Sequence, residues 1–280
     1  MAYEPQTPSL LYPDTSVLFD DNFTNGFCGW EELVNPTGAF SQAMNTPLSL
    51  SSRGGLGGYS LLLQTNSVER TTYGSQAIAI KRVIQPYIPG SVGKVAAEWW
   101  FSYGSENVTE SSGFPGAPAT ITFEVDSQTD ASSTTSIVTG QRAYFQAQWQ
   151  PQSGGSWGFT TSNGPAYGQG GYVSPDSNLF TSGYKSIFPY NGNKRNINYV
   201  CLTVNVRTGA YVSLIANNQF FDLTACPKGT LAGPISPTDP SYNVSDINGL
   251  LNSIVNVNNR STTATTASFV EIHRARMSLT

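Results

Sequence analysis

Charged side chains are scarce in this sequence. Asp, Glu, Lys and Arg make up 11% of its 280 residues, whereas a typical globular chain carries about a quarter. The net charge of −4 and the pI near 5.0 provide no basic surface for nucleic acid. No apolar run approaches the ~20 residues that a bilayer-crossing helix needs. We therefore expect neither nucleic acid nor a membrane among the partners.

Cysteine and histidine are rare as well. The three cysteines, Cys28, Cys201 and Cys226, are an odd number without the spacing of a zinc site. At least one of them must be free, and we interpret all three as packing thiols. The single histidine, His273, lies in a strand-like segment, and no Gly-x-Ser-x-Gly motif precedes a helix. The sequence therefore indicates neither a zinc centre nor nucleophilic catalysis.

Turn-forming and aromatic residues are abundant, with 27 Gly, 17 Pro, 14 Tyr and 14 Phe. The most informative stretch covers residues 198–223. Apolar side chains recur there at every second position from Val200 to Val206, which is the period of a strand with one face on the core. Asn217-Asn218 predicts a tight turn, because Asn tolerates positive φ. This stretch predicts an antiparallel three-stranded meander, a unit from which β-sandwiches are built.

Alternating apolar residues predict further strands at 17–19, 47–50, 59–64, 77–83, 93–103, 121–126, 142–150 and 268–279. Only residues 246–255 show helical spacing, with Ser245 as a cap, so we predict one short helix there. Residues 1–16 contain three prolines and predict an extended N-terminal arm. We interpret residues 17–280 as a single domain that includes an aromatic and glycine-rich excursion at 151–196.

Several segments resemble known jelly-roll proteins. FDDNFTNGFCGW, GGYSLLLQT and FVEIHRARMSL are similar to segments of concanavalin-like and laminin-G-like domains. AIAIKR, AEWWFSY, ITFEVDSQT, RAYFQAQW and PYNGNKRNINYVCLTVNV resemble a family of uncharacterised jelly-roll proteins from actinobacteria and their phages. The resemblance covers residues 17–279. It implies an all-β, antiparallel jelly-roll sandwich in a phage or bacterial-surface setting, and it brings no established catalytic residues.

Glu124 and Asp126 form the strongest candidate for acid–base chemistry. Two residues apart on a strand, they share one face, and a retaining glycoside hydrolase needs a pair of carboxylates. Jelly-roll glycosidases carry Glu-x-Asp-x-x-Glu on such a strand. Here Thr129 occupies the third acidic position, and Asp130 lies one step beyond it on the opposite face. We therefore predict a polar sheet face rather than an enzyme, with a divergent hydrolase as the minority hypothesis.

Three acidic residues provide a candidate calcium site. Jelly-roll carbohydrate-binding modules often hold an ion between the first and last strands with hard oxygen ligands. Asp20, Asp21 and Glu271 lie in the matching segments. The alternative is that Asp20 and Asp21 simply cap a turn. We predict no other cofactor.

Aromatic residues at outward or loop positions are the remaining signal. Sugars stack on such rings beside polar side chains, and the same residue types are enriched in protein–protein interfaces. The candidate ligand or interface residues are Trp100, Tyr103, Glu124, Tyr144, Gln146, Gln148, Trp157 and Tyr172.

The leading hypothesis from the sequence is a non-enzymatic structural protein on a bacteriophage virion. It would decorate the capsid or belong to the tail and dock on other virion proteins as symmetric copies. The neutral-polar composition is typical of an extracellular protein, yet the N-terminus lacks a secretion signal. Synthesis in the host cytoplasm, followed by exposure on the virion surface, would account for both observations. The alternative is a lectin-like module that binds host or environmental glycan.

Overall fold

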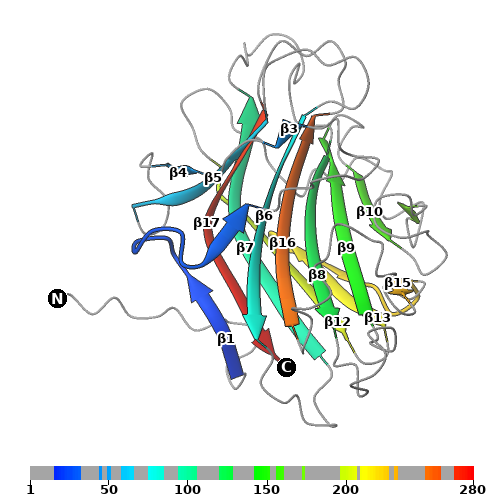
Figure 1. The fold of residues 1–280 in the computed structure, drawn as a ribbon. Coiled ribbons are helices and arrows are strands. Elements are labelled where there is room, and N and C mark those ends of the chain that lie inside the picture. Colours follow the sequence, from blue (N-terminus) through cyan, green and yellow to red (C-terminus); the bar gives the residue numbers. More distant parts are fainter. Residues whose placement is uncertain are drawn as a thin grey trace.

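The computed structural model describes residues 16–32, 44–45, 49–51, 58–65, 75–84, 94–105, 120–128, 142–151, 156–160, 172–173, 196–206, 209–226, 230–232, 250–259 and 268–280. These residues form seventeen β-strands and no α-helix. The strands build an antiparallel β-sandwich of the jelly-roll type, as the sequence predicts (Figure 1). Within the described part of the chain, no helix is long and apolar enough to cross a membrane.

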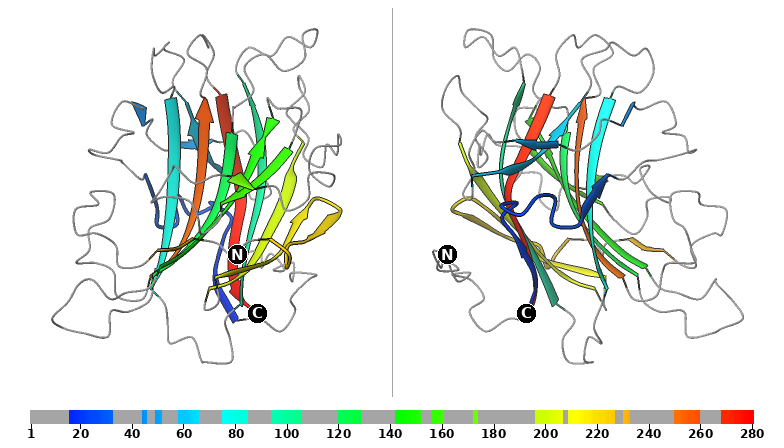
Figure 2. Two further views of the ribbon diagram at one scale, coloured as in Figure 1. Left: turned by 90° about the vertical axis from the view of Figure 1, so that its right-hand side faces the viewer. Right: turned by 60° about the vertical axis from the view of Figure 1, so that its left-hand side comes forward.

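The first sheet, here the β7–β17 sheet, has β7 and β17 at its centre. Strand β1 also pairs with β17, so the two ends of the described chain lie side by side (Figure 2). From one edge to the other, the strands are β14 (Gln219–Asp222), β13 (Ala210–Ala216), β12 (Asn198–Asn205), β7 (Lys94–Ser105), β17 (Ser268–Leu279), β5 (Ser60–Gln64) and β4 (Ser49–Ser51), with β1 (Ser16–Asp21) beside β17.

The second sheet, the β8–β16 sheet, packs against the first. Its strand pairs are antiparallel apart from the short parallel pair of β3 and β6. In order, the strands are β11 (Tyr172–Val173), β10 (Ser156–Thr160), β9 (Arg142–Gln150), β8 (Thr120–Gln128), β16 (Leu250–Asn259), β6 (Ser75–Ile84) and β2 (Trp30–Glu32), with β15 (Thr230–Ala232) beside β9 and β3 (Met44–Asn45) beside β6.

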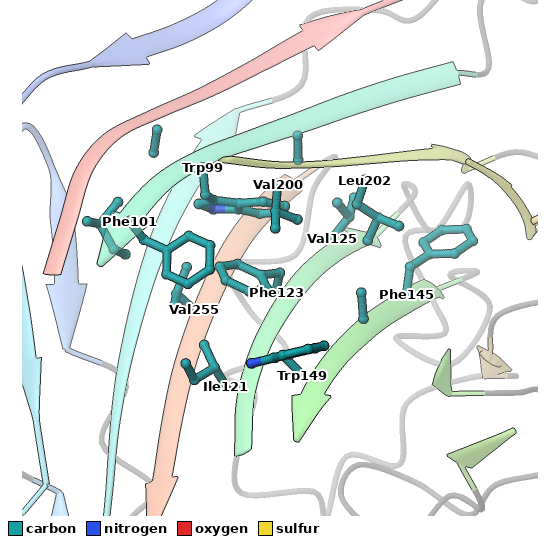
Figure 3. Packing of buried hydrophobic residues seen from close by; sticks show 14 of the residues in the cluster. Trp99, Phe101, Ile121, Phe123, Val125, Phe145, Trp149, Val200, Leu202 and Val255 are labelled. Carbon is teal, nitrogen blue, oxygen red and sulfur yellow. The ribbon is translucent and has the colours of Figure 1, made fainter. Parts of the chain in front are cut away.

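Large aromatic side chains fill the space between the two sheets (Figure 3). Phe123 of β8 lies at the centre, with its ring centroid 5.2 Å from that of Trp99 and 4.8 Å from that of Phe101, both on β7. All three rings are completely buried. Burial of such side chains is the main favourable contribution to folding, so the strand alternation that aims them inward defines the fold.

Polar contacts also join the sheets. The Trp99 Nε1 donates to Ser253 Oγ of β16 at 3.2 Å, and the backbone N of Gln146 in β9 donates to the Tyr211 hydroxyl of β13 at 3.0 Å. Buried polar groups need partners. These hydrogen bonds therefore fix how the two layers align while satisfying groups inside the core.

The predicted helix at 246–255 is wrong. Residues 250–259 form strand β16, between β6 and β8, while residues 246–249 lie outside the described part. Leu251, Val255 and Val257 face the core, and Ile254 packs with Ile78 and Ile80 of β6 on the opposite face. Apolar residues on both faces of a strand imitate helical spacing, which explains the error.

Most of the other sequence-based expectations for the fold are confirmed. The strands β7, β8, β9, β12 and β13 lie where alternation predicts them, and Asn217 has a positive φ of 53° at the predicted turn. All three cysteines are free; Cys201 and Cys226 are buried, and Cys28 is half-buried. Residues 1–15 of the predicted arm lie outside the described part of the chain, and so does most of the excursion at 151–196. The domain boundaries therefore stay predictions.

Strand β17 contains a bulge at His273. Phe101 pairs with Ile272 and Trp100 with Arg274, so His273 is an extra residue in the ladder. On its other side β17 pairs with β5 before the bulge and with β1 after it. A bulge shifts the alternation by one residue. Side chains at 274, 276 and 278 therefore face outward, whereas 275 and 277 enter the core.

The aromatic core yields a test of the fold. Substituting Phe123→Ala removes a completely buried ring that contacts two others, and we expect it to lower the free energy of unfolding by about 3–5 kcal/mol. Phe220→Ala is the matched control, because Phe220 on β14 is 68% exposed, and its effect should stay within about 0.5 kcal/mol. Urea denaturation of both variants measures the difference, and equal effects would contradict the assigned core.

Candidate functional site

The outward side of the β8–β16 sheet is polar. On β8, Ile121, Phe123 and Val125 face the core, and the period of two directs the residues between them to the other side. This outer polar face extends over three adjacent strands, and its members are Thr120, Thr122, Glu124, Asp126, Gln146, Gln148, Gln150, Asn252, Asn256 and Asn258.

The strand register aligns these side chains in rows across the sheet. Glu124 pairs with Gln146 of β9 on one side and Ile254 of β16 on the other. One row further along, Thr122 lies between Gln148 and Asn256. Directly opposed residues have Cβ atoms about 4.5–5.5 Å apart. Carboxylate, amide and hydroxyl groups from three strands therefore lie within contact of one another.

Hydrogen bonds fix the orientation of the groups around Glu124. Gln146 Nε2 donates to Glu124 Oε1 at 2.7 Å, and Thr122 Oγ1 donates to the same oxygen at 2.9 Å. Asn252 Nδ2 makes a longer contact of 3.4 Å with Asp126 Oδ2. Because the carboxylates accept from amide N–H groups, the amide oxygens are turned away from them.

Three asparagine side chains of β16 have an amide oxygen without a hydrogen-bond donor. The Oδ1 atoms of Asn252, Asn256 and Asn258 are buried and have no hydrogen-bond partner among the residues that the structure describes. All three belong to the outward side of β16. A buried polar atom without a partner is rare in folded proteins and calls for an explanation, such as a ligand that supplies the missing group.

Exposure increases toward one end of the outer polar face. Glu124, Asp126 and Gln148 are at most 2% exposed, whereas Gln150, Asn256 and Asn258 are half-buried. The last three lie at the same end of the sheet, since Asn258 pairs with Thr120 and Trp149 with Ile121. A ligand would therefore reach the face from this end.

An apolar strip borders the polar residues. Ile78 and Ile80 of β6 and Ile254 of β16 form a separate hydrophobic cluster on this side of the sheet. Each is at most 5% exposed. These side chains therefore pack against one another beside the polar residues.

The structure brings together three of the predicted site residues, Glu124, Gln146 and Gln148, on the outer polar face. Tyr144 and Tyr172 lie in β9 and β11, but their side chains are outside the described part. The sequence reasoning missed Asn252, Asn256 and Asn258, because they fell in or beside the predicted helix. Their alternation with Val255 and Val257 was the signal that could have revealed a strand.

The expectation that Tyr103 and Trp157 face outward is wrong. They are 2% and 4% exposed and belong to the hydrophobic core. Tyr103 has the same parity on β7 as Phe101, so the strand period directs it inward, where its hydroxyl accepts a long 3.5 Å hydrogen bond from Trp149 Nε1. The ring of Trp157 packs 5.2 Å from that of Trp149.

Trp100 lies on the opposite side of the molecule, on the outward face of the β7–β17 sheet. Its ring centroid is 4.9 Å from that of Tyr199 and 5.2 Å from the Arg274 Cζ. Arg274 forms a bidentate pair with Asp20, with Nε to Oδ1 at 2.7 Å and Nη2 to Oδ2 at 2.6 Å. Trp100 is thus a half-buried member of an aromatic and ionic cluster.

Beside this cluster, Glu98 accepts a hydrogen bond from the Tyr199 hydroxyl at 3.0 Å. Burial raises the pKa of the Tyr199 hydroxyl far above its ordinary value. Burial also raises the pKa of the Cys201 thiol to about 12, with a smaller contribution from Glu98. Both groups therefore stay protonated near neutral pH, which makes the thiol unreactive.

Ser102, His273 and Glu271 form a buried hydroxyl–imidazole–carboxylate group. Ser102 Oγ lies 3.0 Å from His273 Nε2 and 3.4 Å from Glu271 Oε2, while Ser51 Oγ donates to Glu271 Oε1 at 2.9 Å. The first contact has the length expected of a nucleophile and its base. All three residues are at most 2% exposed, so we interpret the group as support for the β17 bulge.

The predicted calcium ligands are not brought together. Asp20 is paired with Arg274. Asp21 contacts Lys81 Nζ at 3.2 Å and accepts from Trp30 Nε1 at 2.9 Å, and burial raises its pKa against the opposing effect of Lys81. Glu271 binds the hydroxyls of Ser51 and Ser102. Among the described residues no group of three or more His, Cys, Asp or Glu could hold a metal ion, and calcium binding stays a prediction.

Fold and site together define a jelly-roll β-sandwich with a polar outer face on one sheet. Over residues 9–271 the chain matches the family described as domain of unknown function DUF6772, and it belongs to that family. No curated protein matches it. The predicted origin in actinobacteria or their phages stays a prediction.

Solved structures with a similar fold include binding modules and enzymes. The cellulose-induced protein Cip1 has 12% sequence identity and a TM-score of 0.47, with 94% of this chain and 96% of that chain covered. The CBM2 module of the evolved Dit protein from Lactobacillus casei BL23 phage J-1 has 8% identity and a TM-score of 0.44, covering 94% and 95%. Alginate lyase A1-II' has 10% identity and a TM-score of 0.43, covering 91% and 96%.

Removal of metal ions tests the acidic cluster. Because Asp20 and Asp21 already have cationic partners, we expect EDTA to leave the melting temperature unchanged in differential scanning calorimetry. Asp20→Asn is the control, since loss of its ion pair should lower the melting temperature equally with and without EDTA. A melting temperature that falls in EDTA and recovers with excess calcium would instead support the calcium site.

Proposed function

We propose that the protein is a non-enzymatic carbohydrate-binding module and that its ligand binds to the outer polar face of the β8–β16 sheet. One observation carries this proposal. The side chains of Asn252, Asn256 and Asn258 present a row of buried acceptors without donors. Sugar hydroxyl groups supply such donors at close intervals.

The surrounding groups suit the same ligand. Neutral amides and the carboxylates of Glu124 and Asp126 accept hydrogen bonds from hydroxyls, and the amides also donate. We place the entry at the half-buried end, next to Gln150, Asn256 and Asn258.

We propose binding without cleavage because of the contacts of the two carboxylates. Glycoside hydrolysis requires one carboxyl group to donate a proton and a second to act as nucleophile or base. Glu124 accepts hydrogen bonds from Thr122 and Gln146, and Asp126 accepts from Asn252. In this arrangement the carboxylates orient neighbouring side chains, and we propose that this is their role.

Glycan binding provides the direct test. On an array of neutral oligosaccharides the wild-type protein should bind a subset, which isothermal titration calorimetry then quantifies. Substituting Asn256→Ala together with Asn258→Ala removes two acceptors, and we expect about a tenfold loss of affinity, at roughly 0.5–1.5 kcal/mol per hydrogen bond. The melting temperature should not fall, since neither Oδ1 contributes a hydrogen bond in the free protein.

Asn218→Ala is the matched control. Asn218 is exposed in the turn between β13 and β14, on the other sheet, so its loss should leave affinity unchanged. Wild-type affinity in the double variant would refute this location of the site. Release of reducing sugar by the wild-type protein, abolished by Glu124→Gln, would refute binding without catalysis.

A second candidate function is that of a structural protein on a bacteriophage virion, in capsid decoration or in the tail. Phe220 favours it. This ring is 68% exposed on the edge strand β14 and lies opposite the half-buried Ile215. Large exposed aromatic residues commonly anchor protein–protein contacts. The predicted arm at residues 1–16 would contribute to the same docking, on the virion surface.

The virion hypothesis predicts that the protein co-sediments with assembled particles as multiple copies. Phe220→Ser and deletion of residues 2–16 should each reduce the amount incorporated, because each removes a proposed contact while sparing the core. Tyr59→Ser, at a ring that is 45% exposed on the entry to β5, is the control. Full incorporation of both altered proteins would argue against this function.

A further inference from the structure

Arg276 on β17 is a buried arginine with an unfilled donor. Only 7% of the residue is exposed, and its Nε has no acceptor among the residues that the structure describes. The bulge at His273 directs Arg276 to the outward face of the β7–β17 sheet, away from the outer polar face described above. A buried guanidinium is ordinarily paired with an anion or a carbonyl oxygen.

The acidic residues nearest to Arg276 in the sheet are otherwise engaged. Arg276 is in register with Asp20 of β1 and with Glu98 of β7. Asp20 forms its bidentate pair with Arg274, and Glu98 accepts from the Tyr199 hydroxyl. Although both residues are directly opposite Arg276 in register, neither accepts a hydrogen bond from its Nε.

Two hydroxyl groups, one further along β17 and one just after it, also lack a hydrogen-bond partner among the described residues. Ser278 is completely buried and Thr280 lies at the end of the chain, and the Oγ of Ser278 and the Oγ1 of Thr280 have no partner in the described part of the structure. Opposite Ser278 is Ala96, which is also completely buried. Lys94, two residues before Ala96 on β7, adds an exposed cation on this side.

The neighbouring Arg274 demonstrates which ligand suits this geometry. Through the edge formed by Nε and Nη2 it binds both oxygens of the Asp20 carboxylate. Arg276 has the same edge with a vacant Nε, and a planar carboxylate matches it with two parallel hydrogen bonds. Ser278 and Thr280 could donate to the same anion.

We propose that Arg276, Ser278 and Thr280 form a binding site for the carboxylate of a small organic acid, on the opposite sheet from the proposed carbohydrate site. The ligand binds through the Arg276 Nε edge and a hydroxyl donor. Glu98 close by limits the attraction for anions, so the affinity is modest. The acid belongs either to a sugar, as in a uronic acid, or to a simple carboxylic acid.

Thermal shift measurements with sodium acetate and sodium glucuronate test the site, against sodium chloride at equal ionic strength. Either salt should raise the melting temperature of the wild-type protein by linkage. Arg276→Gln should abolish the shift, and Ser278→Ala should reduce it. Arg82→Gln is the matched control, since the half-exposed Arg82 pairs with Glu31 on the other sheet, and it should keep the full shift.

Arg276→Lys covers the case in which Arg276→Gln fails to fold. It retains the charge but lacks the Nε edge, and titration calorimetry should register at least a tenfold weaker association. Glucuronate binding more tightly than acetate assigns the acid to a sugar, and equal binding assigns it to a simple carboxylate. An equal shift in the wild-type, Arg276→Lys and Arg82→Gln proteins, or no shift in any of them, overturns the proposal.

Discussion

The contact of Phe123 with Trp99 and Phe101 is the constraint on which the rest of the structure depends. These rings close the space between the sheets, and their inward direction fixes the parity of β7 and β8. A strand cannot bury Phe123 without presenting Glu124 on its other side. The chemistry of the outer polar face is therefore a geometric consequence of the core. A shift of one residue in the register of β8 would turn Glu124 into the core and Phe123 onto the outer face.

Strand β17 has a bulge that changes which of its residues face the core. Its first half pairs with β5 and its second half with β1, and the extra residue His273 lies where the partner changes. Without this bulge, the alternation set by Val270 and Ile272 would direct Arg274 and Arg276 into the core. The buried hydrogen bonds of Ser102 around His273 stabilise the irregularity. Both arginines owe their outward direction to this residue.

Alternation predicted most of the fold and half of the site. It placed Glu124, Gln146 and Gln148 on one face, because a simple period is visible in sequence. It failed for Asn252 and its neighbours, where apolar residues on both strand faces imitated a helix. It also could not foresee that Asp20 pairs with a residue 254 positions away. Such pairings depend on register between distant strands, which no local pattern encodes. Tyr103 shows a different failure, since its parity on β7 already indicated the core.

The unfilled amide and guanidinium groups of the two proposed sites are of opposite kind, and this is a physical argument for two different ligands. Asn252, Asn256 and Asn258 lack donors, whereas Arg276 lacks an acceptor. Each unsatisfied buried polar group costs about 1–3 kcal/mol in the free protein, and more where charge is involved. A ligand that completes the hydrogen bond removes this penalty, so part of its binding free energy is the relief of a cost that folding leaves in place. Since an acceptor row favours hydroxyl-rich ligands and a guanidinium edge favours carboxylates, one uncharged sugar would not complete both sites.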